Sequence, residues 1–124
     1  MTSDAFKRSL KIHQEKGFFR NLKILRGIER ESLRVTQEGR ISQRKHPENL
    51  GSPLTSEDIT TDFAEALVEL VTPTFESAEE LFQHLSLLHK FLYSEMEEEI
   101  LWNFSMPCAF KNEKEIKIAE YGHT

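Results

Sequence analysis

The sequence predicts an α+β fold, in which helices pack together with hairpin-forming strands. A leucine-rich segment at 77–96 has the spacing and the N-terminal cap of a helix. An apolar segment at 22–35, followed by the turn sequence TQEG, has the pattern of a β-hairpin. With 124 residues, of which 38% are apolar, the chain has the length of one domain and enough apolar side chains for a core.

A peripheral helix is predicted at the N-terminus. Ser3 or Asp4 can cap it, Lys16 is its expected last residue, and Gly17 is placed to end it. Few apolar residues recur on one side of this segment, so we expect it to bury little surface.

Strands and a loop are expected next. The predicted hairpin joins 22–35 to the RIS segment at 40–42, and the proline-containing stretch 43–58 predicts a loop. The segment 59–73 fits two structures. Its apolar residues at 63, 66, 67, 70 and 71 fit one face of a helix, whereas its VELVTP end is typical of a strand.

The helix at 77–96 begins with a capping box formed by Ser77 and Glu80. Its leucines recur at helical spacing, at positions 81, 85, 88 and 92. The acidic run 95–99 opposes the helix dipole, which indicates either fraying or a cation nearby, and of the two explanations we expect a solvated helix end. The sequence then predicts a short buried strand within 101–110, and a turn with a further segment over 111–124.

Composition and charge exclude several classes of protein. Residues 35–124 carry a net charge of −10, which argues against nucleic-acid binding. Residues 1–34 carry a net charge of +5, which could face phosphates, but these residues are spaced like a solvated helix face. No apolar run approaches the roughly 18 residues of a membrane span, and no signal peptide is recognisable. The single cysteine, Cys108, excludes an intramolecular disulfide. We therefore expect a soluble cytoplasmic protein that binds neither nucleic acid nor membranes.

Two glutamates in the first predicted strand are candidate metal ligands. Glu29 and Glu31 are two residues apart, which in a strand puts both carboxylates on one face, roughly 6 to 7 Å apart. Two such anions repel each other unless a cation lies between them, and magnesium favours carboxylate oxygens. The alternative is an exposed edge strand in which Glu and Arg simply alternate.

A second acidic group occurs in the sequence DFAEALVEL. Asp62, Glu65 and Glu69 share one stripe if the segment is helical. In a strand, Glu65 and Glu69 share a face, and Asp62 joins Glu69 only through a bend or bulge. A helix N-terminus with solvated glutamates explains the same residues without a metal. The five histidines have no metal-ligand spacing, Cys108 has no recognisable base, and no glycine-rich phosphate loop is present.

Four blocks of sequence, in this order and spacing, resemble the start of the proteobacterial glutamate-cysteine ligases. The blocks are GIERESLRV, HPENLGSPLT, ITTDFAEALVELVTP and WNFSMPC, and the resemblance covers residues 22–122. It implies a catalytic domain related to glutamine synthetase, with a curved, mainly antiparallel sheet that binds ATP and two or three magnesium ions. It also implies that 59–73 is a sheet strand, entered through a turn at the TTDF sequence.

The resemblance implies a reaction and a set of site residues. ATP would phosphorylate the γ-carboxylate of L-glutamate, and the amine of L-cysteine would attack the acyl phosphate to give γ-glutamylcysteine, the first step of glutathione synthesis. Glu29, Glu31, Asp62 and Glu69 match the family's metal-binding carboxylates, for magnesium or alternatively manganese. Phe63 matches a residue that lines the pocket for the cysteine side chain.

Family members are several times longer than this chain. We therefore expect residues 1–124 to be the N-terminal part of a ligase catalytic domain, inactive in isolation, with the C-terminal part of the same enzyme as its partner. Two alternatives stay open at this point. One is a related carboxylate-amine ligase with another amine acceptor, and the other is a non-catalytic interaction domain that binds a partner through the helix at 81–92.

Overall fold

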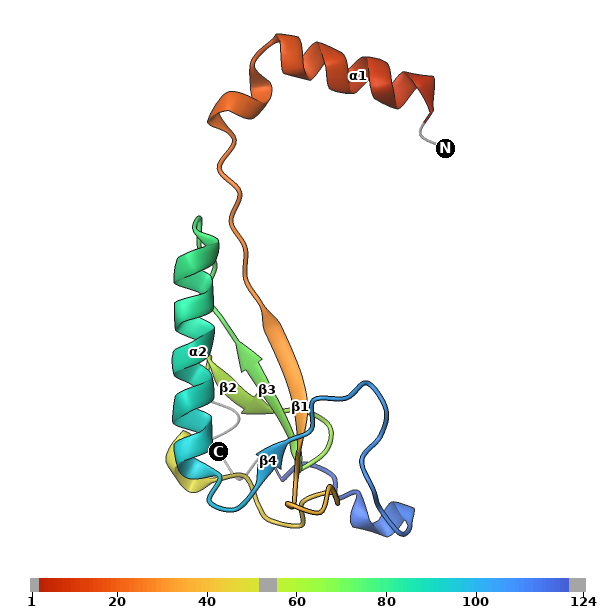
Figure 1. Ribbon diagram of the computed structural model, residues 1–124, viewed down its shortest axis with the longest axis vertical. Coiled ribbons are helices and arrows are strands. Elements are labelled where there is room, and N and C mark those ends of the chain that lie inside the picture. The colour runs from red at the N-terminus through yellow and green to blue at the C-terminus, as the bar shows by residue number, and fades with distance from the viewer. Residues whose placement is uncertain (1–2, 52–55, 121–124) are drawn as a thin grey trace.

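The computed structural model describes residues 3–51 and 56–120 and has the predicted α+β fold. Four antiparallel strands form one sheet in the order β2-β3-β1-β4, and the long helix α2 lies along one face of it (Figure 1). The bounds of these elements are Glu29–Val35 for β1, Ile59–Thr61 for β2, Leu67–Val71 for β3, Ala78–Glu95 for α2 and Ile100–Leu101 for β4.

The N-terminal helix α1 extends over Asp4–Glu15, as the sequence predicts. The Ser3 hydroxyl caps it by accepting a hydrogen bond from the Phe6 amide, and Gly17 follows it in the left-handed conformation. The helix contains no buried residue. A 3₁₀ turn over Phe18–Asn21 and an extended segment join it to the sheet, from which it projects (Figure 1).

The hairpin after β1 is confirmed, but β1 is shorter than predicted. Val35 bridges Ile41, and the amide of Thr36 donates to the carbonyl of Arg40 at 2.8 Å. Gly39 occupies the turn with a φ of +75°, which explains the glycine of TQEG. The strand begins at Glu29 and not at residue 22, since the segment before it makes an isolated bridge between Arg26 and Phe75 and hydrogen bonds between Ile28 and Thr72 but no continuous ladder.

The segment that fitted either a helix or a strand forms β2, a turn and β3. Val68 and Leu70 of β3 face α2 and are almost fully buried, whereas Glu69 points to the opposite face. This alternation has the period of two that a strand imposes. The helical interpretation of 59–73 is therefore wrong. The strand implied by the family resemblance, entered through a turn at the TTDF sequence, is confirmed as β3, while Ile59–Thr61 forms the separate strand β2.

The main core lies between the sheet and α2. Ser77 caps α2 through its hydroxyl, which accepts hydrogen bonds from the amides of Glu79 and Glu80. Core residues come from the sheet, the helix and the loop before β2; they are Leu50, Ile59, Val68, Leu70, Leu88, Leu92, Met96 and Leu101. A smaller cluster on the opposite face packs residues 102–116 against one end of β1 and includes Val35, Ile41, Ala66 and Cys108.

Two predictions for the residues after α2 are wrong. Glu99, expected to be solvated, is 6% exposed because its carboxylate forms an ion pair with the fully buried Arg34. The strand expected within 101–110 is confined to β4, at Ile100–Leu101, and 103–107 are exposed. Among the described residues, no helix is long and apolar enough to cross a membrane.

Candidate metal centre

Three of the four predicted metal ligands share the sheet face that α2 does not cover. Glu31 of β1 and Glu69 of β3 are directly opposite each other in the antiparallel pair. Directly opposed side chains have their Cβ atoms roughly 4.5 to 5.5 Å apart. Glu29 lies two residues from Glu31 on the same face, opposite Val71.

Asp62 completes the group from the turn that follows β2. Because Thr60 is opposite Glu69, the alternation along this segment brings Asp62 to the same face. Its carboxylate accepts a hydrogen bond of 2.8 Å from the amide of Phe63 and is otherwise open to solvent. Phe63 itself is 68% exposed, which leaves its ring accessible beside Asp62.

The other three carboxylates lie close enough to Glu69 for their charges to act on it. The pKa of Glu69 is raised, first by its partial burial and then by the negative charges of Glu31, Asp62 and Glu29. The arginines of β1 do not relieve this repulsion, because they point to the α2 side of the sheet. Arg30 contacts His89 of α2 and Asn103 there, and Arg34 binds Glu99.

The donor set fits a hard divalent cation. Magnesium commonly uses one or two carboxylates and fills its other positions with water and substrate phosphates. In the structure the four carboxylates lie on one face, but they do not surround a common position that a metal ion could occupy. Among the described residues, no three acidic, histidine or cysteine side chains are arranged so that they could hold a metal ion together.

Glu65, the third acidic residue of DFAEALVEL, has a different environment. It is 5% exposed, and its carboxylate accepts hydrogen bonds from the backbone amides of His46 and Glu120. It therefore stands apart from the open carboxylate face. The sequence signals this only weakly, through the alanines on either side of it, which indicate a tightly packed position.

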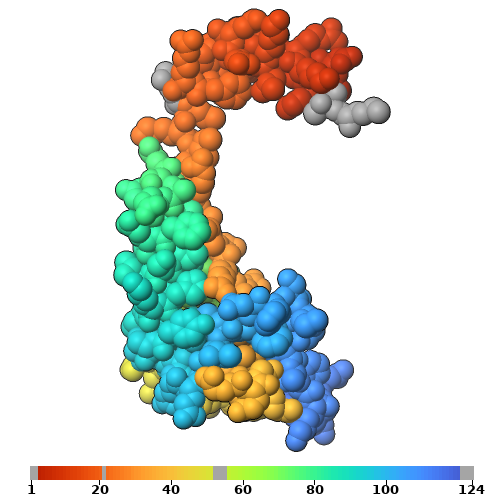
Figure 2. Space-filling view, viewed as in Figure 1, coloured from red at the N-terminus to blue at the C-terminus, as the bar shows by residue number. Residues whose placement is uncertain are grey.

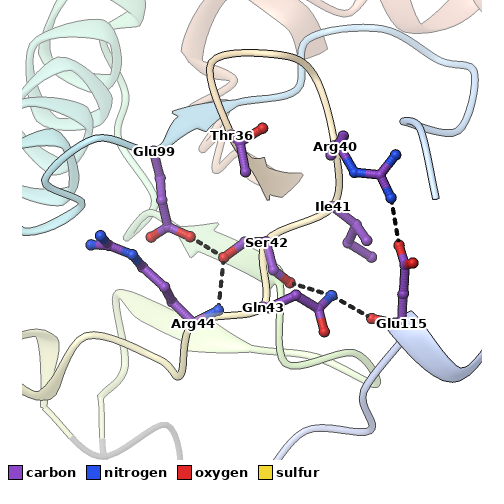
Figure 3. A pocket seen from close by; sticks show the side chains of 8 residues that line it. All are labelled: Thr36, Arg40, Ile41, Ser42, Gln43, Arg44, Glu99 and Glu115. Carbon is purple, nitrogen blue, oxygen red and sulfur yellow. Dashed lines mark hydrogen bonds and ion pairs between the residues drawn. The ribbon is translucent and has the colours of Figure 1, made fainter. Parts of the chain in front are cut away.

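A pocket of about 370 Å³ lies beside the hairpin that follows β1 (Figure 3). Its polar groups satisfy one another: Arg40 pairs with Glu115 at 3.0 Å, the side chain of Gln43 donates to the carbonyl of Glu115, and Ser42 donates to Glu99. None of the five predicted site residues lines it. We assign it no ligand.

Solved structures share this fold. The crystal structure of a glutamate-cysteine ligase from Francisella tularensis in complex with AMP matches 79% of this chain with a TM-score of 0.75 and 42% identity. A bifunctional glutathione synthetase from Pasteurella multocida matches 76% with a TM-score of 0.72 and 38% identity. The chain covers 20% and 13% of these two structures, respectively.

Sequence comparison agrees. The family model for glutamate-cysteine ligase matches residues 8–124. The glutamate-cysteine ligase of Pseudomonas putida strain W619 is 52% identical over 98 residues, which are 79% of this chain and 19% of that protein. The one from Pseudoalteromonas translucida is 46% identical over 114 residues, 92% of this chain and 21% of that protein. The chain belongs to the glutamate-cysteine ligase family, and it spans about a fifth of the length of these relatives.

Proposed function

We propose that this chain supplies the carboxylate-bearing sheet face of an ATP-dependent glutamate-cysteine ligase. The observation that carries the proposal is the direct opposition of Glu31 and Glu69 on an open face, with Glu29 and Asp62 beside them, in a chain of this family. A structural role alone does not explain why a sheet would place Glu69 beside three further carboxylates whose charges raise its pKa.

Glu29, Glu31, Asp62 and Glu69 are the residues that would hold magnesium. When bound, the metal neutralises phosphate charge on ATP and polarises the phosphoryl group for attack. The four side chains would fix the position of that charge relative to the sheet, because three of them stand on paired strands whose register is set by backbone hydrogen bonds. Manganese has the same ligand preference and could replace magnesium.

Phe63 would contact the amine substrate. An exposed aromatic ring next to Asp62 offers an apolar surface for a thiol side chain, and sulfur packs favourably against aromatic rings. This role distinguishes a cysteine-specific ligase from a related carboxylate-amine ligase with another acceptor.

The proposed reaction has two steps. The γ-carboxylate oxygen of glutamate attacks the γ-phosphorus of ATP, and ADP leaves, which gives an acyl phosphate. The cysteine amine then attacks the acyl carbon, phosphate leaves with the C–O bond electrons, and the amine loses a proton. The contacts to adenine and to glutamate would come from protein corresponding to the remaining length of the relatives.

Metal binding can be tested on the 124-residue chain. Titration with Mn²⁺, followed by electron paramagnetic resonance of the free ion, should show binding that falls at least tenfold in Glu31→Gln and Glu69→Gln. Glu57→Gln, which changes an exposed glutamate just before β2, is the matched control and should bind like the wild type. Equal binding by all four proteins would remove Glu31 and Glu69 from the site.

The reaction can be tested in a chimera. Residues 1–124 replace the matching segment of the Pseudomonas putida ligase, and γ-glutamylcysteine and ADP are measured. We expect an active chimera whose kcat/KM falls about 100-fold or more in Glu69→Gln, in line with the loss of a metal-binding group. An inactive chimera that is folded and binds Mn²⁺ would contradict the assignment of this chain to a ligase site.

A further inference from the structure

The buried carboxylate of Glu65 holds the turn that carries Asp62 and Phe63. Both of these residues are exposed, whereas Glu65, near the other end of the turn, is 5% exposed. Glu65 lies between β2 and β3, and its position decides where the turn sits relative to Glu69. The chain thus has an acidic residue in this turn whose role the metal centre does not explain.

Each oxygen of the Glu65 carboxylate binds a different distant segment. Oε1 accepts a hydrogen bond of 2.8 Å from the backbone amide of His46, in the loop that follows the hairpin. Oε2 accepts one of 2.7 Å from the backbone amide of Glu120, in the last described segment. Side chains of these two segments also meet, since Lys45 pairs with Glu120 at 2.9 Å.

The backbone of the turn is held at the same place. The Glu65 carbonyl accepts a hydrogen bond of 2.9 Å from Arg34, which is itself neutralised by Glu99. The Glu65 amide donates to the carbonyl of Lys117 at 2.9 Å. The carbonyl of Phe63 accepts a hydrogen bond of 3.0 Å from Ala119.

A carboxylate is required at this position because both partners are donors. An ionised carboxylate accepts at both oxygens, whereas an amide has one acceptor and would turn its NH₂ group towards a second N–H. Buried backbone amides without a partner are costly, so the two segments would separate from the turn in a glutamine variant. Glu65 therefore joins its own turn to β1, to the loop at His46 and to the segment at Lys117–Glu120.

We propose that Glu65 is a positioning residue that orients Asp62 towards the metal centre and Phe63 towards the amine substrate. The proposal rests on the proposed function of the carboxylate face. It adds that this function needs the loop at His46 and the segment at Lys117–Glu120, which contribute none of the candidate ligands themselves.

The test uses Mn²⁺ and ¹⁵N-labelled 124-residue chain. In the wild type, bound Mn²⁺ should broaden the amide resonances of Glu31, Glu69, Asp62 and Phe63. In Glu65→Gln, broadening should persist unchanged at Glu31 and Glu69 but weaken at least twofold at Asp62 and Phe63, because it falls with the sixth power of the distance from the ion, and the affinity for Mn²⁺ should fall about tenfold.

The matched control is Glu115→Gln, which changes another carboxylate that ties the C-terminal segment to the hairpin, through Arg40. Both variants loosen this region, but Glu115→Gln should leave all four resonances broadened. Unchanged broadening at Asp62 and Phe63 in Glu65→Gln would overturn the proposal. Absence of broadening in the wild type would instead overturn the proposed function of the carboxylate face.

A measurement on the wild type keeps the proposal testable if Glu65→Gln does not fold. The amides of His46 and Glu120 should exchange with deuterium at least 100-fold more slowly than the amide of Lys45. Fast exchange at either of the two amides would show that Glu65 does not hold these segments, and would overturn the proposal.

Discussion

Glu69 is partly buried, and three other carboxylates add their negative charge to the effect of this burial. Its pKa is raised in the folded protein, so the folded state holds the proton more tightly than the unfolded state. Stability therefore falls as the pH rises from the ordinary pKa of glutamate to the raised one, and the loss persists at neutral pH. In the absence of metal, the charge of Glu69 destabilises the fold.

The first prediction follows from this repulsion. At pH 7 with a chelator, Glu69→Gln should raise the free energy of unfolding by about 0.5 kcal/mol, the size typical of a cross-strand charge pair. Urea unfolding followed by circular dichroism measures this, with Glu57→Gln as the control. Magnesium at millimolar concentration should stabilise the wild type but not Glu69→Gln. A less stable Glu69→Gln would mean that Glu69 has a favourable contact and that the carboxylates are not in conflict.

Phe63 allows a prediction in which stability and activity separate. Because the ring is 68% exposed, Phe63→Ala should change the free energy of unfolding by less than about 0.5 kcal/mol. In the chimera it should raise the KM for cysteine about tenfold, which corresponds to the loss of about 1.4 kcal/mol of apolar contact. The KM for ATP should not change.

Phe104→Ala is the matched control, since Phe104 is 67% exposed and lies outside the proposed site. If both variants change the KM for cysteine equally, or neither does, Phe63 does not contact the substrate.

At the scale of elements, the sequence predicted the features that are determined by residues close to one another in the chain. The Ser77 cap, the leucine spacing of α2 and the turn at Gly39 are local signals, and all three are confirmed. The spacing of Glu29 and Glu31 likewise predicted one shared face. The segment 59–73 was ambiguous because its apolar residues satisfy both periods, and only pairing with β1 decides between them.

Local sequence patterns did not predict the register of the strands. That Glu31 is opposite Glu69 follows from the pairing of two strands separated by the whole hairpin and loop. The burial of Glu99 is also non-local, because its partner Arg34 is 65 residues away in the sequence. The acidic run 95–99 at a helix C-terminus indicated a nearby cation as the alternative to solvation, but no local pattern identified Arg34 as that cation.

The ion pair of Arg34 and Glu99 joins β1 to the end of α2 and yields a prediction at this scale. Both side chains are buried, and their charged atoms are 2.8 Å apart. Glu99→Gln leaves the Arg34 charge buried without a counterion and should cost about 3 kcal/mol of unfolding free energy. Urea unfolding measures the loss.

A matched control is the exposed pair of Arg44 and Glu97, where Glu97→Gln should cost less than about 1 kcal/mol. The double variant Arg34→Met with Glu99→Leu should recover most of the stability lost in Glu99→Gln. Equal effects of Glu99→Gln and Glu97→Gln would show that the buried pair is no stronger than a surface one.

The whole molecule divides into the sheet with α2 and the projecting helix α1. Figure 2 shows α1 standing clear of the remaining surface, joined to it by a narrow segment. Its apolar residues Phe6 and Leu10 are 55% and 45% exposed. Because α1 buries no residue, it gains little stability from the fold described here. A helix of 12 residues without such packing is only marginally stable in water.

The last prediction concerns this division. Deletion of residues 1–21 should leave the unfolding free energy within about 0.5 kcal/mol of the wild type, because α1 buries no residue. Deletion of residues 1–28 should cost at least about 1 kcal/mol, because it also removes the bridge of Arg26 with Phe75 and the hydrogen bonds of Ile28 with Thr72, which hold the end of β3.

Far-ultraviolet circular dichroism should show the same loss of helix in both proteins, while Mn²⁺ affinity should persist in the shorter deletion. If deletion of residues 1–21 lowers stability or Mn²⁺ affinity as much as deletion of residues 1–28, α1 contributes to the fold of the sheet, and the carboxylate face does not stand independently of it.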